Sequence, residues 1–181
     1  MRKHLRNLAN IENLGAEFFG KLSHGNNSEY FIISDSIKSR EENFLGHFLH
    51  GLKLKSYEFK KYKTKKETKT ISVNIIGNKN KPNEKKQLRF KALEEGTFYA
   101  RDLVSEPGNV LHPDEYAKRL NSLKKDGLKV TVFNKRKLKK LGMNALLGVG
   151  MGSIRGSYLV TMEWNGAKNN SKPLAFVGKG V

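Results

Sequence analysis

The sequence EKKQLRFKALEEGTFYARDLVSEPG occupies residues 84–108 and separates an earlier half of the chain from a later one. Four of its apolar residues fall nearly in line at helical spacing: Leu88, Ala92, Tyr99 and Leu103. Pro107 cannot continue a helix, because its ring blocks the backbone hydrogen bond. The pattern therefore predicts a helix over residues 84–104, about six turns long and able to bridge two domains.

The earlier half shows two helical and two strand patterns. Apolar spacing predicts a helix over residues 11–23, and the run Tyr30–Ile33 predicts a short strand. Ser39 and Glu42 have the spacing of a capping box, which would begin a second helix with apolar residues on one face. Residues 71–75 alternate as a strand. A sheet of two strands is usually too small to be stable by itself, so we expect this half of the chain to be only part of a domain.

The later half alternates helices and strands. Pro113 occupies a position that favours a helix start, and Gly127 ends that helix. A strand over residues 128–132 and a short basic helix over residues 135–141 lead to a glycine-rich loop. Strands are then predicted at Tyr158–Trp164 and Leu174–Val177. The predicted fold class is α/β.

Composition excludes several classes of function. The chain has 181 residues, no cysteine, and 35 Lys and Arg against 17 Asp and Glu, a formal net charge of +18. Disulfides, thiolate zinc sites and cysteine nucleophiles are therefore excluded. The charge would attract nucleic acid or other anions, but Lys and Asn are abundant throughout, which favours a solvated surface. The sequence offers no signal-peptide or membrane-spanning pattern, so we expect a cytoplasmic protein without a membrane partner.

Most candidate sites have a stronger structural interpretation. The loop Gly148–Gly152 follows a predicted helix and precedes a strand, the reverse of a dinucleotide fingerprint. His47 and His50 lie three apart on a helix, but no third metal ligand stands at helical spacing. His4, His24 and His112 are isolated. Four acids near Pro107 are typical of helix ends: Asp102, Glu106, Asp114 and Glu115.

Three segments resemble the cytosol, or leucyl, aminopeptidase family in the family's own order: Arg101–Leu111, Lys140–Gly150 and Pro173–Val181. Residues 57–66 are similar to the end of that family's N-terminal domain. The departures are Ser105, Gly108, Asn144 and Met151, and none stands at an expected ligand position. The resemblance implies a partial N-terminal α/β domain over residues 1–83, a connecting helix over 84–104, and the start of a mixed-sheet catalytic aminopeptidase domain over 105–181.

The resemblance also implies a site and its cofactors. Family members hold two divalent metals, Mn or Zn, through a lysine, several aspartates and a glutamate, and Lys179 occupies the lysine position. Lysine can ligate a metal only when its amine is neutral. The complete family acts on peptides, removing N-terminal residues, and assembles as a homo-hexamer. Because only Lys179 of the ligand set lies in this sequence, we expect a truncated family member that binds no metal and is inactive alone.

Two alternatives stay open at the level of sequence. The chain could be a basic module that contacts nucleic acid through residues 53–69 and 124–140, where aromatic residues interleave only thinly. It could also be a non-functional remnant of a split gene. The sequence does not determine whether a second polypeptide supplies the other metal ligands.

Overall fold

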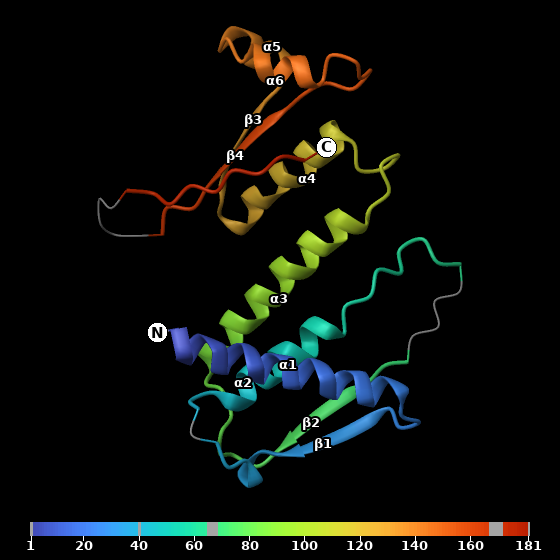
Figure 1. The fold of residues 1–181 in the computed structure, drawn as a ribbon, viewed down its shortest axis with the longest axis vertical. Helices are drawn as coiled ribbons and strands as arrows, with labels where there is room; N and C mark the ends of the chain where they lie inside the picture. Colours follow the sequence, from blue (N-terminus) through green and yellow to red (C-terminus); the bar gives the residue numbers. More distant parts are fainter. Residues whose placement is uncertain (1, 40, 65–68, 167–171, 181) are drawn as a thin grey trace. The chain divides into compact units, whose positions relative to one another are not determined.

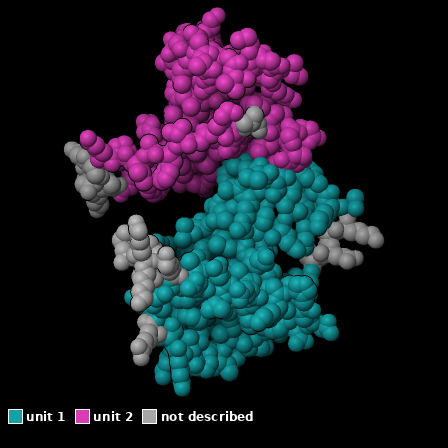
Figure 2. Space-filling view, viewed as in Figure 1, with its two compact units in different colours: residues 1–105 teal, residues 106–181 magenta. Residues whose placement is uncertain are grey.

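The computed structural model describes residues 2–39, 41–64, 69–166 and 172–180. The chain divides into two compact units, Met1–Ser105 and Glu106–Val181 (Figure 2). The predicted connecting helix falls in unit 1, and the assignment of residues 1–83, 84–104 and 105–181 to domains stays a prediction. Among the described residues, no helix is both long and apolar enough to cross a membrane.

Unit 1 contains a two-stranded parallel sheet and three long helices. Its elements are α1 (Arg2–His24), β1 (Glu29–Ile33), the 3₁₀ turn η1 (Ser34–Ser36), α2 (Phe44–Lys55), β2 (Ser72–Ile76) and α3 (Glu84–Ser105). β1 and β2 pair in register from Glu29 opposite Ser72 to Ile33 opposite Ile76. Figure 1 shows α1 and α2 together on one side of these strands. The helices and strands were expected, whereas η1 was not, and α1 begins earlier than the sequence pattern predicts.

Two glycines allow α1 and α2 to pack with their backbones in contact. A Cβ atom on Gly15 would lie 1.9 Å from the carbonyl oxygen of Phe48, and one on Gly51 would lie 1.9 Å from that of Glu12. Four apolar side chains of these helices are buried: Ile11, Leu22, Leu45 and Leu52. The core of unit 1 is therefore the interface between α1 and α2.

The predicted capping box at Ser39 and Glu42 is wrong. The Ser39 hydroxyl accepts a hydrogen bond from the backbone N–H of Glu41 at 3.1 Å, and α2 begins only at Phe44. Asn43, in the left-handed region at φ 63°, is the residue before the helix. Because a turn separates Ser39 from α2, the Glu42 carboxylate is not in the first helical turn; it pairs with Lys86 at 2.7 Å instead.

Unit 2 packs three helices and a 3₁₀ turn around an antiparallel pair of strands. Its elements are α4 (Pro113–Ser122), η2 (Leu123–Asp126), β3 (Lys129–Phe133), α5 (Lys135–Lys140), α6 (Asn144–Val149) and β4 (Leu159–Glu163). β3 and β4 pair from Lys129 opposite Glu163 to Phe133 opposite Leu159. Pro113 starts α4, as expected, but α4 ends at Ser122 and the 3₁₀ turn η2 continues to Gly127, at φ 91°. The buried apolar residues are Ala117, Val130 and Leu138.

The strand predicted at Leu174–Val177 is absent from the structure. Residues 172–180 have no regular secondary structure, and Leu174, Phe176 and Val177 are 81%, 88% and 98% exposed. A strand exists only where a neighbour accepts and donates its backbone hydrogen bonds, and within the described residues the sheet of unit 2 consists of β3 and β4 alone. An apolar sequence with high β propensity was therefore not sufficient to form a strand here.

Candidate functional site

The segment 172–180 carries the predicted metal ligand, Lys179. All nine of its residues are exposed, and Gly178 has open space around its Cα. The segment passes beside α4, because a Cβ atom on Gly180 would lie 2.9 Å from the ring of Tyr116. Figure 1 shows this end of the chain running next to α4 within unit 2. Val181, the last residue of the segment that resembles the family, lies outside the described residues.

The side chains around Lys179 do not form a metal site. In the described part of the chain, no group of three or more His, Cys, Asp or Glu side chains is placed to hold a metal ion. Metals of the type used for hydrolysis need several such donors, usually three or more from the protein. The residues present therefore do not fit a two-metal centre by themselves.

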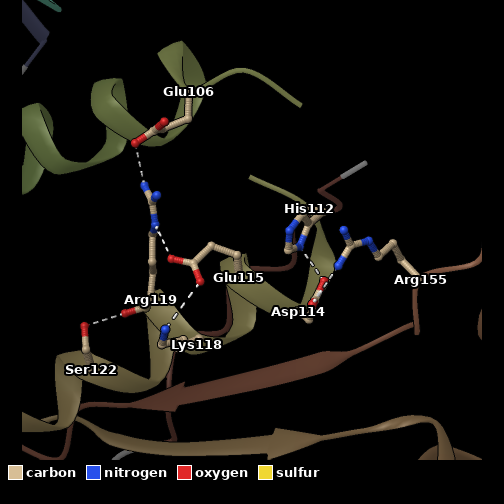
Figure 3. Close-up of polar contacts among 8 residues, drawn as sticks. All are labelled: Glu106, His112, Asp114, Glu115, Lys118, Arg119, Ser122 and Arg155. Carbon is tan, nitrogen blue, oxygen red and sulfur yellow. Dashed lines mark hydrogen bonds and ion pairs between the residues drawn. The ribbon is translucent and has the colours of Figure 1, made fainter. Parts of the chain in front are cut away.

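α4 carries a cluster of ion pairs (Figure 3). Arg119 donates through Nη1 to Glu106 at 2.9 Å and through Nε to Glu115 at 3.1 Å. The Glu106 side chain is only 2% exposed, so its charge is balanced inside the unit by Arg119. The hydrogen bonds that Arg119 donates to Glu106 and then to Glu115 raise the pKa of Arg119, and the bond accepted from Arg119 lowers the pKa of Glu115. The cluster joins the start of unit 2 to α4.

A second group of charges surrounds the first turn of α4. His112 Nδ1 lies 2.5 Å from Asp114 Oδ1, and Arg155 Nη1 lies 3.3 Å from Asp114 Oδ2. Desolvation raises the pKa of Asp114, but the backbone N–H of Asp114 itself, His112 and Arg155 outweigh it, and the pKa is lowered. Arg155 belongs to the loop between α6 and β4, so this group attaches that loop to α4 (Figure 3).

The four acids noted in the sequence do not form an acid pair for catalysis. Glu106, Asp114 and Glu115 are each paired with a cation, as described above. Asp102 belongs to unit 1, where it accepts a hydrogen bond from the hydroxyl of Tyr57 at 2.7 Å. Their interpretation as structural charges near helix ends agrees with this arrangement.

The histidines of α2 bind carboxylates of other helices. Nδ1 of His47 lies 2.7 Å from Glu12 Oε1 of α1, and Nδ1 of His50 lies 2.9 Å from Glu94 Oε1 of α3. Both imidazoles also contact the ring of Phe90, with centroids 5.0 and 5.1 Å apart. They join the three helices and belong to no group of metal ligands found in the described residues. His24 contacts the carbonyl of Gly20, and the side chain of His4 lies outside the described residues.

The glycine-rich loop connects a helix to a strand, which is the order of elements that the sequence indicates. α6 ends at Val149, Gly150–Gly152 turn, and β4 begins at Leu159. A Cβ atom on Gly150 would lie 2.1 Å from the hydroxyl of Ser157, so the loop folds back on itself at that residue. A dinucleotide site needs a strand before such a loop and a helix after it.

Two residues of unit 2 were not singled out in the sequence although they organise its charges. Arg119 follows Glu115 by four residues on α4, and that spacing is a usable signal for a helical ion pair. Arg155 reaches Asp114 across 41 residues of sequence, and no local pattern indicates such a contact.

Comparison with known proteins places these segments in a family. The sequence model described as the cytosol aminopeptidase family, catalytic domain, matches residues 98–181. A probable cytosol aminopeptidase of Chelativorans sp. (strain BNC1) is 43% identical over 165 residues, which are 86% of this chain and 33% of that protein. Residues 98–181 are thus similar to the catalytic domain of the cytosol aminopeptidase family. A second member, from Phytoplasma australiense, is 40% identical over 169 residues, 92% of this chain and 34% of that protein.

Solved structures agree on the fold. The bottromycin maturation enzyme BotP in complex with Mn has a TM-score of 0.71 and 22% identity, covering 87% of this chain and 33% of that one. A mutant tomato leucine aminopeptidase has a TM-score of 0.70 and 20% identity, covering 84% of this chain and 32% of that one. The chain thus spans about a third of the length of the aminopeptidases it matches.

Proposed function

We propose that this chain contributes one portion of a metal-dependent aminopeptidase, an enzyme that removes N-terminal residues from peptides. The match of residues 98–181 to the catalytic domain of the family carries this proposal. The matched range includes Arg101–Leu111, Lys140–Gly150 and the segment that ends in Gly178-Lys179-Gly180. The 40–43% identity of two relatives named as probable cytosol aminopeptidases supports it further.

Within that enzyme, Lys179 would be one of the metal ligands. Two bound divalent metals supply Lewis acidity toward the scissile carbonyl and toward a water molecule. The contribution of this chain is an amine between two glycines, at the end of an exposed segment beside Tyr116. Manganese is favoured by the Mn bound to BotP, a protein of similar fold, and zinc stays an alternative.

We further propose that the chain alone does not hydrolyse peptides. Its described residues hold no cluster of three or more His, Asp or Glu that could complete a metal centre with Lys179. One neutral amine does not hold two divalent cations, and without them the site has no activated water. Hydrolysis of a leucyl amide by this polypeptide, assayed with added manganese or zinc, is expected to stay at the level of the uncatalysed blank. Robust metal-dependent turnover would contradict the proposal.

A chimera tests the role of Lys179. In it, this chain replaces the matched third of the Chelativorans relative, which supplies the rest of that protein. We expect metal-dependent leucyl amide hydrolysis, and Lys179→Met should lower kcat/KM by about two orders of magnitude or more. Lys172→Met, at an exposed lysine of the same segment, is the matched control and should leave the rate unchanged. Equal rates for the Lys179→Met and Lys172→Met chimeras would remove Lys179 from the ligand set.

Three features of the family resemblance and composition stay predictions. They are the homo-hexameric assembly, the cytoplasmic location, and contact with nucleic acid through the net charge of +18. Contact with nucleic acid is tested by titrating the chain against duplex and single-stranded DNA at two salt concentrations. Binding through phosphates weakens steeply with salt, so binding that does not weaken would contradict such contact.

A further inference from the structure

Unit 1 has a pocket at the place where α1, α2 and the last turns of α3 meet. Its volume is about 460 Å³, within the range of small-molecule sites. α1 contributes Glu12, α2 contributes Leu54 and Lys55, and Arg101 comes from α3; Tyr57 follows α2. The pocket is therefore lined by one carboxylate, two cations and apolar groups, contributed by three helices and by Tyr57.

Arg101 is held rigidly at this pocket. Its Nη1 donates to the carbonyl oxygen of Leu54, in the last turn of α2, and its guanidinium carbon lies 5.5 Å from the centre of the Tyr57 ring. The Tyr57 ring is itself fixed, by the hydrogen bond to Asp102 and by the ring of Phe98 at 5.3 Å. A guanidinium has five N–H donors. Capping α2 uses Nη1, and the rest of the planar group is suited to a carboxylate.

The other two charged residues of the pocket come from different helices, Glu12 from α1 and Lys55 from α2. Lys55 is exposed, and among the described residues no carboxylate lies within ion-pairing distance of its ammonium group. Glu12 is 33% exposed and directs Oε1 toward Nδ1 of His47 at 2.7 Å. Its backbone is held against Gly51 of α2, which fixes the position of Glu12 relative to Lys55. The charged groups around the pocket are thus Glu12 with His47, Lys55, Arg101, and Asp102 behind Tyr57.

We propose that this pocket binds a small zwitterion, a free α-amino acid or a dipeptide. Its carboxylate would bind Arg101 and Lys55, its ammonium group would bind Glu12, and its side chain would lie on Leu54 and Tyr57. Binding of a zwitterion uses both signs of charge at the pocket: the N–H groups of Arg101 not used on Leu54, the ammonium group of Lys55, and the second carboxylate oxygen of Glu12. The site lies wholly in unit 1 and needs no metal. This proposal can therefore be tested, and fail, independently of the proposed aminopeptidase activity.

Three probes separate the charges of the ligand. The ¹⁵N-labelled chain is titrated, without metal, with L-leucine, with N-acetyl-L-leucine, which lacks the ammonium group, and with L-leucinamide, which lacks the carboxylate. We expect saturable shifts at the amides of residues 51–57 with L-leucine, and an affinity about 10-fold lower for each analogue, the loss of one charge-assisted contact. No saturable shifts with L-leucine, or equal affinity for either analogue, would overturn the assignment.

Variants inside and outside the pocket test whether the ligand binds there. Lys55→Gln and Glu12→Gln should each weaken L-leucine binding about 10-fold, because each removes one charge partner. Lys53→Gln and Glu17→Gln change exposed residues of the same two helices outside the pocket and should bind like the wild type. Amide spectra without ligand verify that every variant is folded. If the pocket variants and their controls bind L-leucine equally well, the site is not in this pocket.

Discussion

Glu106 is a carboxylate whose side chain is only 2% exposed and whose charge Arg119 balances at 2.9 Å. Replacing Arg119 by methionine keeps much of the side-chain volume and leaves a buried negative charge without that partner. We expect Arg119→Met to lower the free energy of unfolding by about 3 kcal/mol, measured by urea denaturation.

Lys118 provides the control for this prediction. It lies one residue away on α4, is 80% exposed, and approaches Glu115 only to 3.7 Å. Lys118→Met should change the free energy of unfolding by less than about 0.5 kcal/mol, because exposed ion pairs contribute little. Similar losses in the two variants would show that burial of Glu106 does not matter.

Asp35 makes the junction after β1 and β2 sensitive to acid. The backbone N–H groups of Lys79 and Asn78 donate to its Oδ1 at 2.7 and 2.9 Å. The bond from Lys79 is the largest cause, desolvation opposes it, and together with Asn78 the pKa of Asp35 falls below its ordinary 3.8. A lowered pKa means that the folded state favours the carboxylate; the stabilisation is complete above the ordinary pKa and is lost as pH falls through the lowered one.

Asp35→Asn should therefore flatten the acid side of the stability curve. The amide oxygen can still accept from both N–H groups, which bond to a single oxygen of Asp35, but it carries no charge that protonation would remove. Tm measured from neutral pH down to about pH 2 should decrease less steeply in the variant than in the wild type below about pH 4. Parallel curves for the two proteins would be the contrary result, because other carboxylates with lowered pKa, such as Glu42, are common to both.

At the scale of elements, the close contact of α1 and α2 depends on residues without side chains. A methyl group on Gly15 or Gly51 would meet a backbone carbonyl of the opposite helix at 1.9 Å, and backbone atoms cannot move aside without separating the helices. Gly15→Ala and Gly51→Ala should each destabilise the chain by about 2 kcal/mol or more, measured by urea denaturation.

Gly20 and Gly96 are matched controls, since a Cβ atom on either meets nothing within 4 Å. Alanine has the higher helix propensity, so Gly20→Ala and Gly96→Ala should raise the free energy of unfolding by up to about 1 kcal/mol. The opposite signs expected at Gly15 and Gly20, on one helix, separate a clash from an effect of propensity. Stabilisation by Gly15→Ala would show that the helices are not in close contact.

Most elements could be predicted from local sequence. Helical spacing, Pro107 and Pro113 indicated α3 and the start of α4, and apolar runs or alternation indicated β1 to β4, because these signals lie within a few residues of one another; α4 ends at Ser122, earlier than the predicted stop at Gly127. The strand at Leu174–Val177 has the same kind of signal but lacks a pairing partner in the described residues. The start of α2 was also wrong, since a turn after Ser39 competed with the capping box.

At the scale of the whole molecule, each unit has a core of its own. Ile11, Leu22, Leu45 and Leu52 are buried in unit 1, and Leu138 is fully buried in unit 2. Leu138→Ala should cost about 2–4 kcal/mol by removing buried methyl groups and leaving a cavity. Hydrogen exchange should show lost protection in β3 and α5 and unchanged protection in α1 and α2. Equal loss in both units would indicate a single cooperative unit.

The sequence by itself determined the α/β class, most helices and strands, and the resemblance to the aminopeptidase family that the comparisons confirm. Each of these depends on residue type and short spacing. Only the tertiary structure decided which polar groups are paired, because the partners are far apart in the chain: His47 and Glu12 by 35 residues, His50 and Glu94 by 44, and Arg101 and the carbonyl of Leu54 by 47. The pocket of unit 1 is lined by residues of α1, α2 and α3 that are far apart in the chain, so no local pattern could indicate it.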